Sequence, residues 1–252
     1  MLCEAYDQVS DCFKTDGPQG VAYDQYPKFQ DFMHYMSNIM HNKTLLTDFV
    51  GSVPELEELL ETGVTVLDVG CGKGRAPMIL AQKFPRSSFY GIDISASAIS
   101  AAQIEAEEMS LTNIHFQVHD AASLPCDWTD KFEYVTALDC IHDQAEPLQV
   151  LHEIRRVLKP GGTFSMLEIA GSSRPNCNIG NPRAIDGYVI SLFHCMPVSL
   201  YFDGGKGLGT MWGRENVLQV LEECGFSEII VRKSRDSFNY HFVSKSHKCP
   251  AH

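Results

Sequence analysis

Several features that would point to particular protein classes are missing from this 252-residue sequence. It contains no run of about 18 apolar residues, so we expect no membrane-spanning helix, and its N-terminus lacks the apolar stretch of a secretory signal. No C-x-x-C pair occurs among the nine cysteines, which argues against a disulfide framework or a structural zinc site. Basic residues are few, 20 against 32 acidic ones, and the net charge of −12 disfavours nucleic acid as a partner. These absences favour a cytoplasmic protein with reduced thiols.

What the chain does contain is an alternation of short β-branched segments with helical ones. Strands are predicted over residues 64–69, 87–92, 113–118, 133–138 and 163–169, and helices over 76–84, 96–109 and 147–158. This order is typical of βαβ units, which build a parallel sheet with helices on both faces. After a helix over 215–223, strands at 228–231 and 239–243 are close enough to pair as an antiparallel hairpin. The predicted fold class is α/β, a doubly wound, mostly parallel seven-stranded sheet with an antiparallel C-terminal hairpin strand.

Two regions fall outside this alternation. Residues 1–62 carry predicted helices over 26–42 and 56–60, and we expect an N-terminal helical extension or lid ahead of a main domain at 63–252. The first of these helices has an apolar stripe that predicts a core face or a cover over a pocket. Residues 171–213 are rich in glycine and proline, with a helical segment near 184–194, and are predicted to form a substrate-pocket insertion. The stripe consists of Phe29, Phe32, Met33, Met36 and Met40.

The most informative segment is VLDVGCGKG at residues 66–74, where a buried strand leads through a G-x-G-x-G turn into a helix. Glycines there let the backbone approach a ligand at the carboxyl end of a strand, where open α/β sheets bind ligands. Asp93 ends the second strand, and its carboxylate can accept the hydroxyl protons of a ribose. This spacing leaves a dinucleotide and S-adenosylmethionine open, although a G-x-G-x-G turn disfavours NAD and no Walker A loop is present. Asp68 is placed to meet an ammonium group of the ligand.

Several motifs carry a family resemblance. VLDVGCGKG, GIDIS and HDAASLP resemble the cofactor motifs of class I S-adenosylmethionine-dependent methyltransferases. LDCIHDQAEP, LKPGG, SLFHCMPVSL, GGKGLGTMWGRE and DSFNYHF resemble a bacterial and invertebrate family of that class, whose members often carry an N-terminal winged helix. The resemblance spans about residues 13–243, and too few residues precede position 26 to form a winged helix.

The resemblance implies the class I methyltransferase fold, with S-adenosylmethionine as cofactor and S-adenosylhomocysteine as product. It also implies a set of cofactor-binding residues that follow strands one to four. They are Gly70, Cys71 and Gly72 behind the methionine part, Asp93 at the ribose, Ile94 over the adenine, Asp120 and Ala121 at the adenine's amino edge, and Asp139 on the floor between cofactor and substrate.

Methyl transfer requires an acceptor held in line with the methyl group, and a general base where the acceptor carries a proton. His142 follows the fourth strand and is our candidate base, with Asp143 as its orienting partner or as a substrate ligand. A structural hydrogen bond capping the next helix is the alternative. No metal-ligand spacing emerges, and no metal is expected. The predicted substrate pocket draws on the N-terminal helix, the fifth strand, the insertion and the last hairpin: Tyr26, Glu168, His194, Trp212, Asn239 and Tyr240.

The methyl acceptor stays open on sequence grounds. A small molecule is favoured. A protein methyltransferase, a non-catalytic regulator that binds S-adenosylmethionine, and an NAD-dependent oxidoreductase are the alternatives. The glycine turn predicts cofactor binding in the first three cases, so only turnover separates an enzyme from a regulator. The sequence specifies neither the acceptor atom nor the oligomeric state.

Overall fold

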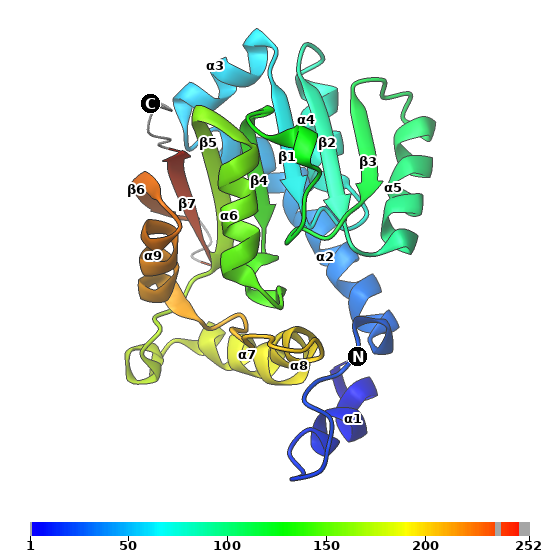
Figure 1. Ribbon diagram of the computed structural model, residues 1–252, viewed down its shortest axis with the longest axis vertical. Coiled ribbons are helices and arrows are strands. Elements are labelled where there is room, and N and C mark those ends of the chain that lie inside the picture. Colours follow the sequence, from blue (N-terminus) through cyan, green and yellow to red (C-terminus); the bar gives the residue numbers. More distant parts are fainter. Residues whose placement is uncertain (1, 235–237, 247–252) are drawn as a thin grey trace.

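A seven-stranded sheet forms the centre of the computed structural model, which describes residues 2–234 and 238–246 (Figure 1). The strand order is β3-β2-β1-β4-β5-β7-β6. Strands β1 to β5 are parallel, whereas β7 is antiparallel to both β5 and β6. The predicted fold class is therefore confirmed. The strands are β1 Thr65–Val69, β2 Ser88–Asp93, β3 Ile114–Val118, β4 Phe132–Leu138, β5 Leu158–Ile169, β6 Phe226–Lys233 and β7 Asn239–Ser246.

Helices cover both faces of the sheet because each presents an apolar stripe to it. One core contains apolar side chains of α3, α4 and α5, and the other contains those of α6 and α9. All five lie close to their predicted ranges. Their bounds are α3 Pro54–Thr62, α4 Arg75–Lys83, α5 Ala96–Glu108, α6 Pro147–Val157 and α9 Gly213–Glu223.

Strand β5 begins earlier than expected. Leu158 already pairs with Phe132 of β4, and the register then shifts before Tyr134 pairs with Thr163. The Pro160-Gly161-Gly162 segment, which closely follows the helix predicted over 147–158, lies inside this irregular strand, with Gly161 at a φ of 75°. A Pro-Gly-Gly sequence indicates a turn locally, but pairing with Phe132 at the start of β4 extends the strand through it.

The N-terminal segment packs against the insertion. Its elements are η1 Leu2–Ala5, α1 Tyr6–Asp11, η2 Tyr23–Gln25, α2 Pro27–Thr44 and η3 Leu45–Val50. A third apolar cluster joins Val9, Val21, Tyr26 and Phe29 to Val198 of α8. The predicted division at residue 62 stays a prediction, since side chains of η3 and α3 also belong to the core around α4 and α5.

The structure contradicts a core face for the apolar stripe of α2, whereas its other expected role, a cover over a pocket, stays a prediction. Phe29 is buried, but Phe32, Met33 and Met36 are 36%, 39% and 38% exposed. Only the first turn of α2 contributes to the cluster with α8. The periodicity of apolar residues predicted the helix correctly, but it did not predict which of its side chains are buried.

The insertion lies at the carboxyl ends of the strands, below the sheet in Figure 1. It contains η6 Pro175–Asn178, α7 Pro182–Ile190, η7 Ser191–Cys195 and α8 Met196–Leu200, which confirms the helical segment expected near 184–194. Short helices η4 Cys126–Trp128 and η5 Ile141–Asp143 follow β3 and β4. In the described part of the chain no helix combines the length and apolarity needed to cross a membrane. The seven cysteines whose side chains the structure describes are all free thiols: Cys12, Cys71, Cys126, Cys140, Cys177, Cys195 and Cys224.

Candidate active site

The glycine turn after β1 leaves open space above its middle residue. Gly70, Gly72 and Gly74 have φ values of 67°, 55° and 78°, which disfavour other residues. A Cβ added at Gly70 would lie 2.8 Å from the Cys140 sulfur, and one at Gly74 would lie 2.4 Å from the Phe116 ring. At Gly72 an added Cβ would meet no atom within 4 Å. Two of the glycines thus allow close packing, and the central one faces a space that a ligand can fill.

Asp93 closes this space at the end of β2. Its Oδ2 accepts a hydrogen bond of 2.9 Å from the Gly72 N–H, and its Oδ1 accepts one of 2.8 Å from the Ser95 N–H. Burial raises the pKa of Asp93 above its usual value. Each carboxylate oxygen keeps a second lone pair, so the group can still accept from ligand hydroxyls.

Next to Asp93, the Ile94 side chain is 60% exposed although the strand before it is buried. Across the same edge, Asp120 Oδ1 accepts a hydrogen bond of 2.8 Å from the Ala122 N–H, and Ala121 is buried. An open glycine turn, a carboxylate with free lone pairs and an exposed apolar side chain fit an S-adenosyl group. The glycine turn is suited to the methionine part, the carboxylate to the ribose and the apolar side chain to the adenine ring.

Asp68 lies inside the sheet beneath the turn. Thr136 Oγ1 donates a 2.6 Å hydrogen bond to Asp68 Oδ1, and burial raises the pKa of this carboxyl to about 7. The carboxylate therefore gains its charge near neutral pH. Its role toward a ligand ammonium group stays a prediction.

Asp139 follows β4 with a left-handed backbone, at a φ of 51°. Burial raises its pKa to about 7, and the charge of Glu168 adds to the increase. Asn239 Nδ2 donates a 2.9 Å hydrogen bond to Asp139 Oδ1. Asn239, predicted as a pocket residue, thus holds the carboxyl that the resemblance places on the floor of the site.

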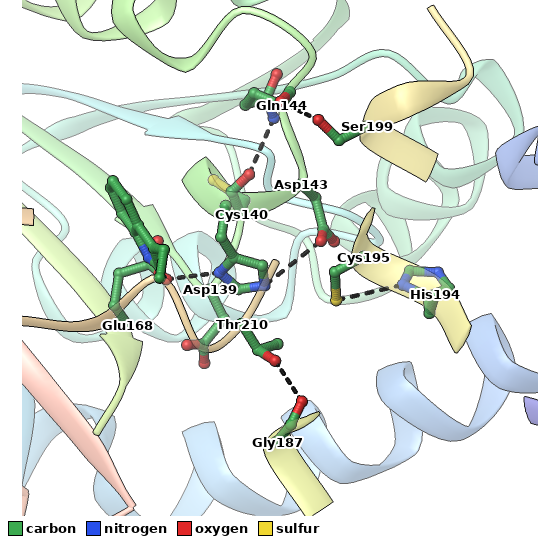
Figure 2. A network of polar contacts seen from close by, with 12 residues as sticks. Asp139, Cys140, Asp143, Gln144, Glu168, Gly187, His194, Cys195, Ser199 and Thr210 are labelled. Atoms are coloured by element: carbon green, nitrogen blue, oxygen red, sulfur yellow. Dashed lines mark hydrogen bonds and ion pairs between the residues drawn. The ribbon is translucent and has the colours of Figure 1, made fainter. Parts of the chain in front are cut away.

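His142 is buried between two carboxylates at the ends of β4 and β5. Its Nδ1 lies 2.5 Å from Glu168 Oε2, and its Nε2 lies 3.4 Å from Asp143 Oδ1. Trp212 Nε1 donates a 3.1 Å hydrogen bond to the same Glu168 oxygen. Burial by itself lowers the pKa of His142, but Glu168 and Asp143 together raise it well above its usual value. Figure 2 shows Glu168 and Asp143 reaching toward this point from different elements.

Around His194 in η7, the N-terminal segment meets the insertion. The rings of Tyr26 and Phe29 lie 4.8 Å and 4.4 Å from the His194 ring, and that of Tyr23 lies 5.8 Å from it. Burial lowers the pKa of His194. Its Nδ1 is 3.6 Å from the sulfur of Cys195, which lies near His142 and Asp143.

The structure thus brings most of the predicted catalytic and pocket residues to one edge of the sheet. Tyr240 lies opposite Glu168 in the register of β5 and β7 and packs on Phe242. A hollow of about 430 Å³ between η6 and α7 is lined by none of the predicted pocket residues. Cys195 and the contacts of Glu168 were missed from the sequence. The one available signal was that β4 and β5 are neighbours, which places His142 and Glu168 at the same edge.

Comparisons with known proteins agree with this geometry. A family model described as a methyltransferase domain matches residues 60–189. The demethylmenaquinone methyltransferase of Listeria monocytogenes is 30% identical over 180 residues, covering 68% of this chain and 73% of the relative. A ubiquinone biosynthesis O-methyltransferase of Leptothrix cholodnii is 28% identical over 100 residues, covering 40% of this chain and 42% of the relative.

Two solved structures show the same fold. A putative O-methyltransferase from Nostoc punctiforme matches 96% of this chain and 69% of its own, with a TM-score of 0.72 and 18% identity. The CurJ carbon methyltransferase matches with a TM-score of 0.58 and 18% identity over 74% of this chain. This chain spans about half of the CurJ structure, 49% of its length.

Proposed function

This chain belongs to the methyltransferase domain family and is an S-adenosylmethionine-dependent methyltransferase, and we propose that it methylates a small hydroxylated aromatic acceptor. The observation that carries the proposal is the buried His142, held by Glu168 at the carboxyl ends of β4 and β5. The relatives support a small acceptor, since their names specify methylation of demethylmenaquinone and of an oxygen in ubiquinone biosynthesis.

The cofactor side of the site is assigned to the turn after β1 and the ends of β2 to β4. Gly72 gives the backbone room for the ligand, and Asp93 accepts from the ribose hydroxyls. When bound, the cofactor supplies an electrophilic methyl group on a sulfonium sulfur. The remaining residues assigned to this side are Asp68, Gly70, Cys71, Ile94, Asp120, Ala121 and Asp139.

On the acceptor side, His142 removes the acceptor's proton. Glu168 accepts from the Nδ1–H, so Nε2 is the nitrogen that carries the lone pair once the ring is neutral. Because Glu168 and Asp143 raise the pKa of His142 well above its usual value, the neutral ring forms only toward alkaline pH, and turnover should increase with pH. Trp212 holds the Glu168 carboxylate from the other side. An acceptor hydroxyl beside Nε2 would donate its proton to the ring, which leaves its oxygen as the nucleophile for the methyl group, and the bond from that methyl group to the sulfonium sulfur would break to give S-adenosylhomocysteine. Asp143, 3.4 Å from Nε2, stabilises the imidazolium that results.

Aromatic side chains of the N-terminal segment close the site. Tyr26, Phe29 and Tyr23 pack around His194, so residues 1–62 act as a lid whose contacts with the insertion exclude water. Exclusion of water strengthens every polar interaction with the acceptor. The pocket assigned to the acceptor includes Tyr26, Glu168, His194, Trp212, Asn239 and Tyr240.

The test is turnover with labelled S-adenosylmethionine and a panel of catechols, hydroquinols, amines and peptides, followed by mass spectrometry. We expect methylation of hydroxylated aromatics, and His142→Ala should lower that turnover by about 10²–10⁴-fold while cofactor affinity stays the same. His152→Ala, at an exposed position on α6, is the matched control. Methylation of peptides alone, or an unchanged rate in His142→Ala, would refute the proposal.

A further inference from the structure

Three potential metal ligands converge beside the proposed base. A ring nitrogen of His142, a carboxylate oxygen of Asp143 and the sulfur of Cys195 all lie within 4.8 Å of one another. His142 and Asp143 belong to η5 after β4, whereas Cys195 comes from η7 of the insertion. The insertion therefore completes the cluster, and Figure 2 shows Asp143 and Cys195 facing each other across it.

The spacing is close to that of a tetrahedral site. Zn²⁺ holds nitrogen and oxygen ligands at about 2.0–2.2 Å and sulfur at about 2.3 Å, so neighbouring ligand atoms lie about 3.3–3.7 Å apart. The His142 Nε2 to Asp143 Oδ1 distance of 3.4 Å already meets this condition. The sulfur needs to move by roughly 1 Å at most to meet it as well.

The surroundings of His142 are those of a metal-ligating imidazole. Such a histidine donates its other ring N–H to a carboxylate, which fixes the tautomer and makes the ligating nitrogen more basic. Glu168 takes this position at 2.5 Å from Nδ1, and Trp212 holds Glu168 in turn. The second coordination shell is thus already present.

A buried polar atom points to a ligand at the same place. Asp143 Oδ1 is shielded from solvent and accepts no hydrogen bond, although it lies in an ion pair 3.4 Å from His142 Nε2. Leaving a buried polar group without a hydrogen bond is costly, and a bound cation would give Asp143 Oδ1 a partner.

We propose that His142, Asp143 and Cys195 form a binding site for a soft divalent metal ion of the Zn²⁺ class. One thiolate, one imidazole and one carboxylate select Zn²⁺ or Cd²⁺ over Mg²⁺ or Ca²⁺, which take oxygen ligands. Binding releases the proton of the Cys195 thiol and any proton on His142 Nε2. The lone pair of His142 Nε2 then binds the metal and is no longer available to accept a proton. This regulatory consequence rests on the proposed function: the ion inhibits methyl transfer by blocking His142.

The test uses the full chain, reduced with a phosphine and freed of metal by a chelator. Cd²⁺ titration should give a thiolate-to-cadmium charge-transfer band that saturates at one ion per chain. Cys195→Ser should abolish the band, whereas Cys177→Ser, at an exposed thiol in η6, should keep it. Glu168→Gln should weaken Cd²⁺ binding by about 10–100-fold, because it removes the carboxylate that accepts from His142 Nδ1–H and orients the ring. Thermal melts of the metal-free variants establish that each is folded, and Cys195→Ala provides a second removal of the thiol.

Zn²⁺ at saturation should lower turnover of the wild-type enzyme by about 10²-fold or more, and Cys195→Ser should require far more Zn²⁺ for the same inhibition. Absence of the Cd²⁺ band, or a band that persists in both folded Cys195 variants, overturns the metal site. A Cys195-dependent band without inhibition leaves the site standing and instead refutes the role of His142 as base. The two failures are therefore distinguishable.

Discussion

The Asp93 carboxylate connects the glycine turn to the start of α5 through its two backbone hydrogen bonds. We predict that Asp93→Ala weakens binding of S-adenosylmethionine and of S-adenosylhomocysteine alike, because both carry the same ribose. Loss of a charged acceptor costs about 1.5–3 kcal/mol, which is about one to two decades in affinity. Titration calorimetry of both ligands measures the change. Asp127→Ala, an exposed carboxylate on η4, is the control, and an affinity equal to wild type in Asp93→Ala would remove this residue from the site.

At the scale of elements, His241 of β7 fastens η3 to the sheet. Its ring stacks on Phe49 at 4.1 Å, and its two nitrogens hydrogen-bond to Ser52 at 3.3 Å and Ser165 at 3.0 Å. Burial, together with the charge of Arg232, lowers the pKa of His241 from 6.5 to about 3. Between these values the unfolded chain binds a proton that the folded chain does not. Stability contributed by the neutral ring is therefore complete above pH 6.5 and is lost as the pH falls toward 3.

We therefore predict that the free energy of unfolding of the wild type falls more steeply between pH 6.5 and 3 than that of His241→Gln. The difference in slope is at most about 1.4 kcal/mol per pH unit, the contribution of one proton. Urea unfolding at a series of pH values measures both slopes. His152→Gln, exposed on α6, provides a reference, and parallel curves for wild type and His241→Gln would contradict the prediction.

Local patterns predicted the elements themselves, because strand and helix periodicity and the G-x-G-x-G turn are encoded by neighbouring residues. They failed where a distant segment decides the outcome. Pairing with Phe132 extends β5 through a Pro-Gly-Gly sequence, and the exposure of Met33 and Met36 depends on what lies beside α2. The contacts of Glu168 with His142 and Trp212 join residues 26 and 44 positions apart. The last two residues of the site, Asn239 and Tyr240, come from a motif whose start, at Asp236 and Ser237, lies outside the described residues.

At the scale of the whole molecule, a net charge of −12 sets the sign of long-range interactions. We predict no tight binding to duplex DNA or RNA at physiological ionic strength, because a polyanion is repelled by an acidic protein. Fluorescence anisotropy with a labelled duplex, repeated at several salt concentrations, measures this. Affinity that is high at physiological salt and falls steeply as salt increases would show a local basic surface and contradict the prediction.

Asp139 is a residue at which we expect the stability of the folded protein and its turnover to change in opposite directions. A left-handed conformation costs most side chains about 1–2 kcal/mol, and asparagine tolerates it well. Because burial raises the pKa of Asp139 from 3.8 to about 7, the folded state loses stability as the pH increases between these values, the loss is complete above pH 7, and Asp139→Asn removes this cost. We predict that Asp139→Asn melts at a higher temperature than wild type, with the gain largest above pH 7, and that its turnover is lower. A drop in melting temperature would show that this carboxyl serves the fold. The predicted result would show that selection for catalysis has retained an aspartate at position 139 although an asparagine there makes the protein more stable.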